Sequence, residues 1–226
     1  MVDFHGWEMP VQFAGILAEH QAVRTACGVF DVSHMGQVFI TGRDAHRFVE
    51  RVNCNRMSNA PGKGTYAHIL RDDGGILDDS ITYCLEPERF LAIVNAATAE
   101  NDFAWFQRQA QGLDVRLENA SDRYGMLAVQ GPRAPALIGE IFPTALALPR
   151  FGIAELPFAG EKVFVMRTGY TGEDGFEVAA PTGGILAFWD VLLARGGPQG
   201  LVPCGLGSRD TLRLEAGYLL YGQDAD

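Results

Sequence analysis

Two adjacent carboxylates stand in a strand-like segment of this sequence, residues 76–85. Side chains alternate between the two faces of a strand, so Asp79 shares its face with apolar and aromatic residues: Leu77, Ile81, Tyr83 and Leu85. Asp78 falls on the more polar face and is unremarkable there. A carboxylate among apolar neighbours is desolvated, which raises its pKa unless a positive or hydrogen-bonding group meets it. Two interpretations of Asp79 stay open: a cap or edge residue, or an acid held in an apolar cleft for a cationic or N–H-bearing ligand.

Asn95 and a glycine-rich turn are further candidates. Asn95 follows the apolar segment RFLAIV and precedes a helical pattern, a position that either gathers ligands or forms a turn. The turn at 169–175, GYTGEDG, holds three glycines, which allow either a close ligand approach or a tight hairpin. The phosphate-binding glycine motifs do not occur, and the two acids of this turn disfavour an anionic ligand.

The histidines and cysteines form no metal-binding or nucleophile motif. All five histidines lie between residues 5 and 68, without an HxxxH or HExxH spacing. The four cysteines form no CxxC pair and are typical of reduced, buried thiols. A GxSxG elbow is also missing. The sequence therefore predicts neither a metal centre nor a disulfide framework.

The charge balance excludes several classes of partner. Lys and Arg number 18 against 28 Asp and Glu, which leaves a formal net charge of −10. Nucleic acids and anionic membranes are bound through clustered positive charge, so we expect neither as a partner. No apolar run reaches the roughly 18 residues of a membrane span, and MVDFHGWEMP is not a signal-peptide start. With 47% apolar residues, we expect a cytoplasmic protein with a sizeable core.

Alternating strand and helix patterns must position these side chains. Residues 36–119 read as strand, helix, three strands, helix and strand, the order of a split βαβ (ferredoxin-like) layout. Aligning Gly42 with Gly131 superposes an apolar strand, a glycine and a helix, which is consistent with a duplicated α+β unit. A later helical pattern, 208–217, has Ser208 as a candidate N-cap and Gly217 as a stop.

The predicted fold class is therefore α+β, with two ferredoxin-like subdomains of antiparallel sheet and helices. We expect residues 1–35 and 120–226 to form one subdomain, into which 36–119 is inserted as the second.

Longer segments together resemble a known family. The sequence contains, in this order, VDFHGWEMPVQF, GVFDVSHMG, GGILDDSITY, VNAAT, AVQGP, GYTGEDGFE and CGLGSRDTLRLEAGYLLYGQDAD. They are similar to the T-proteins of the glycine cleavage system, the tetrahydrofolate-dependent aminomethyltransferases. The resemblance covers essentially the whole chain. It implies transfer of a one-carbon unit from an aminomethyl group on the lipoylated H-protein to tetrahydrofolate, with release of ammonia and without a metal.

The same resemblance implies roles for individual residues. Asp79, the second Asp of GGILDDS, stands at the family's catalytic carboxylate and would stabilise iminium-like positive charge next to a folate nitrogen. Glu173 of GYTGEDG resembles the acid that binds the pterin, and Arg209 would bind the pterin or orient Glu173. The other implied folate contacts are Met35, Tyr66, Ile81, Tyr83 and Asn95.

Family members continue after YGQDAD into a third, β-rich domain. We therefore expect this chain to be the folate-binding part without that C-terminal domain, with weak activity on its own. Two alternative functions share the pocket or fold: a folate-dependent demethylase acting on sarcosine, dimethylglycine or a sulfonium compound, and a non-catalytic folate-binding protein of iron–sulfur cluster maintenance. The latter proteins carry a KGCYxGQE-type segment, which this sequence lacks.

Overall fold

The computed structural model describes residues 1–225, and its chain divides into two compact units. Unit 1 consists of Met1–Ser33 and Tyr124–Leu219, and unit 2 consists of His34–Arg123 and the described part of Leu220–Asp226. Each unit has its own sheet and its own hydrophobic core. The predicted α+β class, with antiparallel sheets and helices, is confirmed.

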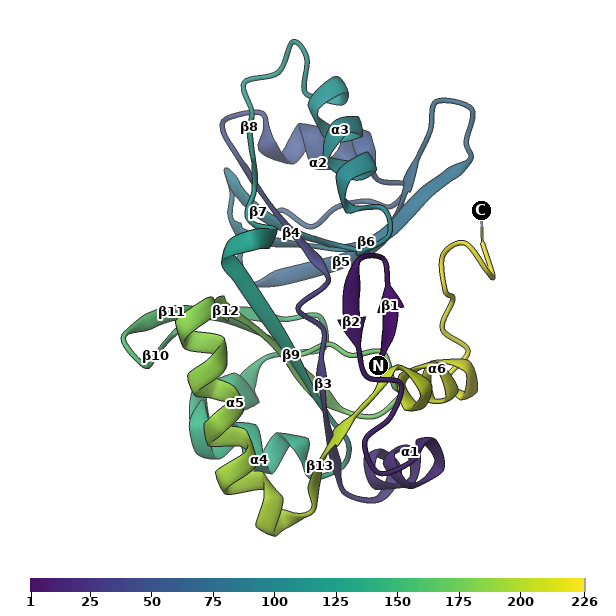
Figure 1. The fold of residues 1–226 in the computed structure, drawn as a ribbon. Helices are drawn as coiled ribbons and strands as arrows, with labels where there is room; N and C mark the ends of the chain where they lie inside the picture. Colours follow the sequence, from purple (N-terminus) through teal and green to yellow (C-terminus); the bar gives the residue numbers. More distant parts are fainter. Residues whose placement is uncertain (226) are drawn as a thin grey trace. The chain divides into compact units, whose positions relative to one another are not determined.

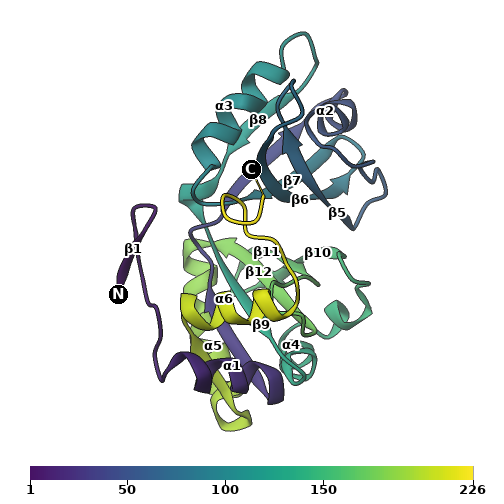
Figure 2. The same cartoon turned by 90° about the vertical axis from the view of Figure 1, so that its right-hand side faces the viewer.

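Unit 2 is a five-stranded antiparallel sheet with two helices on one face (Figures 1 and 2). Its sheet order is β5-β6-β7-β4-β8. Helix α2 buries a stripe that contains Phe48, Val49 and Val52, and these residues pack with Phe106 of α3 in a single core. The elements are β4 (Gly36–Thr41), α2 (Ala45–Val52), β5 (Lys63–Leu70), β6 (Ile76–Glu86), β7 (Arg89–Val94), α3 (Ala99–Gln109), β8 (Arg116–Asn119) and the 3₁₀ helix η1 (Ser121–Arg123).

Unit 1 is a six-stranded sheet, ordered β10-β11-β12-β9-β3-β13, with a separate β1-β2 hairpin. Helices α4 and α5 share one core with the sheet, whereas α1 lies on the opposite face, where a Cβ on Gly28 would stand 2.5 Å from Val23. The elements are β1 (Val2–Phe4), β2 (Trp7–Met9), α1 (Ile16–Thr25), β3 (Cys27–Asp31), β9 (Tyr124–Gln130), α4 (Ala134–Ile141), η2 (Pro143–Ala147), β10 (Ile153–Phe158), β11 (Glu161–Met166), β12 (Gly175–Pro181), α5 (Thr182–Gly196), η3 (Gly197–Gln199), β13 (Leu201–Cys204) and α6 (Leu206–Glu215).

The two units repeat one strand order. The chain runs β4-α2-β5-β6-β7-α3-β8 in unit 2 and β9-α4-β10-β11-β12-α5-β13 in unit 1, and the sheets differ only by β3, which enters between β9 and β13. Gly42 and Gly131 occupy the same place after the first strand, with φ of 127° and 126°. Their carbonyls accept from Ala45 and Ala134, both at 2.9 Å. The predicted alignment of Gly42 with Gly131 is thus confirmed.

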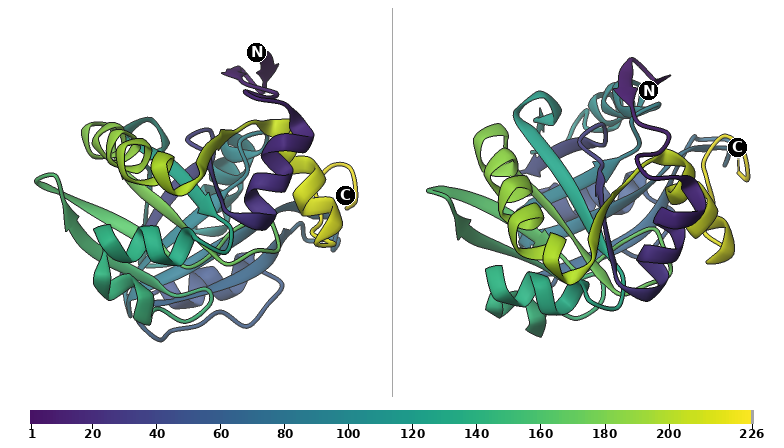
Figure 3. Two further views of the ribbon diagram at one scale, coloured as in Figure 1. Left: turned by 90° about the horizontal axis from the view of Figure 1, so that it is seen from below. Right: turned by 60° about the horizontal axis from the view of Figure 1, so that its bottom comes forward.

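Buried Glu19 joins the two helices of unit 1 that lie side by side, α1 in purple and α6 in yellow (Figure 3). Its Oε1 accepts from the backbone N–H groups of residues 13–15, and its Oε2 from the Gly205 N–H at 2.8 Å and the Ser208 hydroxyl at 3.2 Å. The N-cap of α6 is Gly205, so the prediction of Ser208 as N-cap is wrong: a carboxylate from a distant helix serves the N–H group at this helix start. The predicted stop is confirmed, because α6 ends at Glu215 and Gly217 has φ +70°.

Candidate active site

Strand β6 places its two neighbouring aspartates on opposite faces of the unit 2 sheet. Asp78 points to the face that α2 and α3 cover and is completely buried. The strand residues opposite Ser80 and Thr82, which are Ala67 and Ala92, belong to this core. The interpretation of Asp78 as an unremarkable residue on a polar face is therefore wrong. This face of β6 is polar in sequence, but it is buried under the helices because the neighbouring strands place apolar side chains beside it.

Asp79 lies on the opposite, half-buried face, and both of its carboxylate oxygens accept hydrogen bonds. The Tyr66 hydroxyl on β5 donates to Oδ2 at 2.7 Å, and the Asn95 amide donates to Oδ1 at 2.7 Å. The same amide nitrogen donates to Asp78 Oδ1 at 2.7 Å, and the Asn95 backbone N–H donates to Asp78 Oδ2 at 3.0 Å. We call Tyr66, Asp79, Asn95 and Asp78 the carboxylate network.

The carboxylate network restricts Asp79 from two sides. Asn95 is the first residue after β7, and its amide directs one hydrogen to each aspartate, as acceptor-only carboxylates require. Tyr66 holds the other oxygen from the neighbouring strand. A half-buried carboxylate oriented in this way can accept an N–H group or stabilise a developing positive charge.

Asp102 on α3 is a buried acid that the sequence analysis missed. It is 1% exposed, and burial together with the adjacent charge of Asp78 raises its pKa to about 9. A signal for it was present in the sequence, because Asp102 shares one helical face with Trp105 and Phe106, both of which are buried. An acid on the apolar face of a helix needs a specific environment, as Asp79 does on a strand.

Three further predicted contact residues belong to unit 2 but are not members of the carboxylate network as defined above. Ile81 and Tyr83 follow Asp79 at alternate positions of β6; Ile81 is half-buried, and Tyr83 is completely buried. Half-buried Met35 lies just before β4, and its carbonyl accepts from the Gln37 side chain at 2.6 Å. Thus six of the eight predicted site residues belong to unit 2, and Tyr66, Asp79 and Asn95 are directly hydrogen-bonded.

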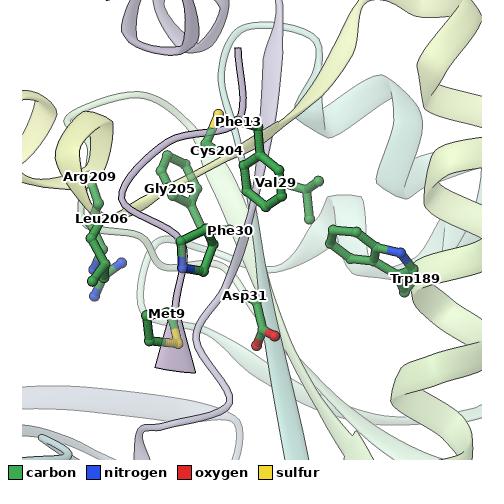
Figure 4. Close-up of a pocket in the computed structure, with 11 residues that line it drawn as sticks. Met9, Phe13, Val29, Phe30, Asp31, Trp189, Cys204, Gly205, Leu206 and Arg209 are labelled. Carbon is green, nitrogen blue, oxygen red and sulfur yellow. The ribbon is translucent and has the colours of Figure 1, made fainter. Parts of the chain in front are cut away.

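The remaining two predicted residues, Glu173 and Arg209, belong to unit 1. Arg209 of α6 lines a mainly apolar concavity that is open to solvent, and Trp189 of α5 lies on its other side (Figure 4). Its guanidinium carbon lies 4.7 Å from the centre of the Tyr170 ring. Burial lowers the pKa of Arg209, and the nearby charge of Glu177 opposes this effect. The concavity thus combines aromatic side chains with the Arg209 cation and the Asp31 carboxylate.

Two acids of unit 1 compete for the role assigned to Glu173. Glu173 accepts from Arg24 of α1 at 3.1 Å, so an internal cation already faces it. Glu177 on β12 is 8% exposed, and its burial raises the pKa of its carboxyl group. A hydrogen bond from the Thr168 hydroxyl at 2.6 Å and the charge of Arg209 act in the opposite direction on this pKa. Sequence reasoning missed Glu177, although it is the single charge in the apolar strand GFEVAAP.

The glycines of the turn at 169–175 serve internal packing. A Cβ on Gly169 would stand 1.8 Å from the buried Gln130 amide, and one on Gly175 would stand 2.5 Å from the Val129 carbonyl. Gln130 in turn donates to the Thr168 carbonyl and accepts from the Thr171 hydroxyl. Of the two interpretations of this turn, the structure thus favours a compact hairpin over a close approach of a ligand to its backbone.

Residues 1–225 contain neither a cluster of metal-ligating side chains nor a membrane-spanning helix. No group of three His, Cys, Asp or Glu side chains in this part of the chain could hold a metal ion. None of the helices in the same residues is long and apolar enough to cross a membrane.

Comparison with known proteins assigns the chain to a family. The model of the GCVT N-terminal domain matches residues 1–226. This chain belongs to the GCVT N-terminal domain family. The domain is 46% identical to an aminomethyltransferase from Chlorobium phaeovibrioides (strain DSM 265 / 1930), over all of this chain and 63% of the relative. It is 44% identical to an aminomethyltransferase from Bacillus subtilis (strain 168), over 99% of this chain and 62% of the relative. This GCVT N-terminal domain thus spans about 63% of the length of such relatives.

Solved structures agree with this assignment. The crystal structure of glycine cleavage system aminomethyltransferase T from Bartonella henselae matches the domain with a TM-score of 0.88 and 34% identity, over 99% of this chain and 60% of that one. A chain of the heterotetrameric sarcosine oxidase from Corynebacterium sp. U-96 matches with a TM-score of 0.54 and 14% identity, over 91% of this chain and 94% of that one. At that identity the second match shows a shared fold alone.

Proposed function

We propose that this GCVT N-terminal domain forms the tetrahydrofolate-binding part of an aminomethyltransferase of the glycine cleavage system. The reaction moves a one-carbon unit from the aminomethyl group on the lipoyl arm of the H-protein to tetrahydrofolate. Ammonia and the reduced lipoyl carrier are released, and 5,10-methylenetetrahydrofolate is formed. The names of the two bacterial relatives and of the Bartonella structure support this proposal.

The observation that carries the proposal is the fixed orientation of Asp79. Its carboxylate is held by Tyr66 and Asn95 on the half-buried face of β6. Transfer of an aminomethyl carbon passes through an iminium-like, positively charged carbon, and an oriented carboxylate stabilises that charge without first having to reorganise. Asp79 would also hydrogen-bond a folate nitrogen and so hold the acceptor for attack, an effect of positioning.

The residues of unit 1 fit the pterin of a folate. A pterin edge presents N–H donors, which suit a carboxylate, and its flat ring suits an aromatic wall. We propose that an acid of unit 1 binds this edge and that Arg209 contacts the pterin or orients the acid. Glu173 is the acid that the family resemblance indicates, and Glu177 is the one that burial and the charge of Arg209 favour. Of the other predicted contacts, Tyr66 would supply an aromatic wall and Met35 and Ile81 would add apolar contacts, whereas Tyr83 is completely buried and would be reached only if the groups that cover it moved.

Titration of the purified protein with tetrahydrofolate, followed by calorimetry, tests the binding part of the proposal. We expect saturable binding that Asp79→Asn weakens and that Asp72→Asn, in the exposed turn between β5 and β6, leaves unchanged. No heat of binding under any condition would contradict the proposal.

A donor assay tests the reaction. Aminomethyl-lipoyl H-protein, sarcosine and dimethylglycine are each offered with tetrahydrofolate, and formation of 5,10-methylenetetrahydrofolate is measured. We expect turnover with the lipoyl donor only. Turnover with sarcosine or dimethylglycine instead would favour the demethylase alternative.

A further inference from the structure

Asp102 lies behind the carboxylate network, and the proposed chemistry does not use it. Its side chain is buried on α3, on the helix-covered face of the sheet where Asp78 is also buried. Neither carboxyl oxygen of Asp102 accepts a hydrogen bond from another described residue. A hydrogen bond between Asp102 and Asp78 requires a proton on one of the two acids. The hydroxyl of Thr98 is nearby and favours the charged form of Asp102, but it donates to the Asn95 carbonyl at 3.3 Å.

Two adjacent buried carboxyl groups do not both ionise, so the pair shares a proton. Asp78 accepts two N–H hydrogen bonds from Asn95, whereas Asp102 accepts none. Donors of this kind stabilise the charged form, which leaves the proton on Asp102. The O–H group of Asp102 then has one acceptor at hand, the Asp78 carboxylate.

The charges around Asp102 agree with this assignment. Asp78 on the same face of β6, and to a smaller extent Asp79 on the opposite face, repel a further negative charge on Asp102. His68 is the residue of β5 opposite Asp79 in the strand register. Burial has the largest effect on the pKa of Asp102 and acts in the same direction as the two aspartates.

We propose that Asp102 is a positioning residue that, as a neutral carboxylic acid, donates a hydrogen bond to Asp78 and so holds the Asp78–Asn95 pair that orients Asp79. Without this donor, Asp78 is anchored by Asn95 alone, and the amide that bridges the two aspartates loses its fixed partner. Hydrogen-bond partners that orient metal-ligating side chains change affinity or activity by about 10–100-fold when removed, and we expect an effect of this size for the donor to Asp78. The effect on catalysis rests on the proposed function, whereas the effect on Asp79 itself does not.

Two variants separate positioning from simple packing. Asp102→Asn keeps the shape and an N–H donor toward Asp78, and Asp102→Ala removes the donor. We expect Asp102→Asn to retain kcat within about threefold, and Asp102→Ala to lower kcat by about 10–100-fold with little change in the KM for tetrahydrofolate. Equal kcat in the two variants would overturn the proposal.

A carboxyl NMR titration decides the proposal without any turnover. The protein is labelled with ¹³C at the aspartate carboxyl groups and titrated from pH 4 to pH 10 without folate. We expect one carboxyl signal of the wild type to stay protonated past neutral pH and to disappear in Asp102→Asn. The carboxyl chemical shift of Asp79 at pH 7 should be the same in wild type and Asp102→Asn and should change in Asp102→Ala, because only the last variant lacks a donor to Asp78.

The two measurements fail in different ways. If no aspartate stays protonated at neutral pH, or if the carboxyl chemical shift of Asp79 at pH 7 is identical in all three proteins, the proposed role of Asp102 is wrong even if the enzyme turns over. If the NMR result is as expected but the wild type neither binds tetrahydrofolate nor transfers methylene, the proposed function fails and the positioning of Asp79 stands. The wild-type titration requires no variant to fold.

Discussion

Units 1 and 2 share one strand order, but the pKa of a buried carboxyl group is lowered in unit 1 and raised in unit 2. In unit 1, burial alone would raise the pKa of Glu19, but backbone N–H groups of Gly205, Phe13, Gly15 and Ala14 lower it. In unit 2, burial and the charge of Asp78 raise the pKa of Asp102. Both side chains are essentially inaccessible to solvent. Two equally buried carboxyl groups thus have pKa shifts in opposite directions, because one accepts backbone N–H donors and the other lies next to a second carboxylate.

The same comparison extends to the strands that carry the proposed chemistry. Strand β6 of unit 2 buries Asp78, Ser80 and Thr82 beneath its helices, while its counterpart in unit 1, β11, buries Val163 and Val165. The backbones repeat, but only the β6 strand presents a carboxylate network. A shared topology thus says where a site could form, and a few side chains say whether it does.

The largest expected effect is that of Asp79→Asn in unit 2. We expect a normal fold and a loss of methylene-transfer turnover of about 10²–10⁴-fold, because the amide carries no charge to stabilise the positive carbon. Circular dichroism and the lipoyl-dependent assay measure the two parts. The matched control, Asp72→Asn, should keep full activity; comparable losses in both would remove Asp79 from the mechanism.

Asp78→Asn should act differently from Asp79→Asn. Sequence reasoning predicts a nearly neutral substitution, but the structure shows a buried acceptor of two N–H groups. An amide there places an NH₂ group where an acceptor is needed, so we expect lower stability as well as lower turnover. Urea unfolding distinguishes the two variants: an unchanged midpoint for Asp78→Asn would contradict this description of its site.

Glu19→Gln tests the charged carboxylate of unit 1. It should lower the free energy of unfolding at pH 7 by about 3 kcal/mol, since one oxygen acceptor becomes a donor facing N–H groups. The folded-state pKa of Glu19 lies below its ordinary value of 4.5, so its contribution is present above that value and is lost as the pH falls through the folded-state pKa. Urea titrations at pH 7 and at progressively lower pH should show the gap between wild type and variant closing.

Asp102→Asn should show the opposite pH dependence in unit 2. The native chain keeps this proton up to a pH of about 9, whereas the unfolded chain releases it near 3.8, so native stability falls as the pH rises between these values. Asp102→Asn removes this dependence, so the free energy of unfolding of the variant should rise relative to that of the wild type as the pH increases. If the stability difference between wild type and Asp102→Asn changed with pH in the same direction as that for Glu19→Gln, the assignment of a neutral Asp102 and a charged Glu19 would be contradicted.

Glu177→Gln and Glu173→Gln sharpen the assignment within unit 1. We expect Glu177→Gln to weaken tetrahydrofolate binding by about 1.5–3 kcal/mol, because a charged acceptor is lost from a buried position. Glu173→Gln should have the smaller effect, since Arg24 already pairs with that carboxylate. Calorimetry on both variants compares them directly, and a larger loss for Glu173→Gln would restore the assignment based on the family resemblance.

The smallest effects concern the repeated glycines. Gly42→Ala and Gly131→Ala should each destabilise by about 1–3 kcal/mol, because their φ values suit only glycine and an added Cβ would approach a backbone carbonyl oxygen at 2.4 Å and 2.6 Å. Urea unfolding should give similar losses for the two variants. A loss at only one position would show that the repeated turns are not equivalent.

The sequence by itself determined the fold class and much of the repeat. Alternation and helical periodicity are local properties, and the glycine after each first strand marks a backbone conformation that other residues rarely adopt. For the same reason Asp79 and Asn95 could be selected as exceptions within apolar segments, although the pattern left their roles open. The tyrosine and the second aspartate of the carboxylate network were not linked to them by any spacing.

Only the tertiary structure decided which face of β6 is buried and which groups meet there. Period-two alternation separates the two faces of a strand but cannot say which face the helices cover, because that depends on the neighbouring strands and their register. Asp102 and Asp78 are 24 positions apart and meet only because α3 packs on that face. Likewise, the donors to Glu19 come from both ends of unit 1, near residues 13 and 205. The protonation of a buried acid depends on partners that the chain brings together in space, and no local pattern contains that information.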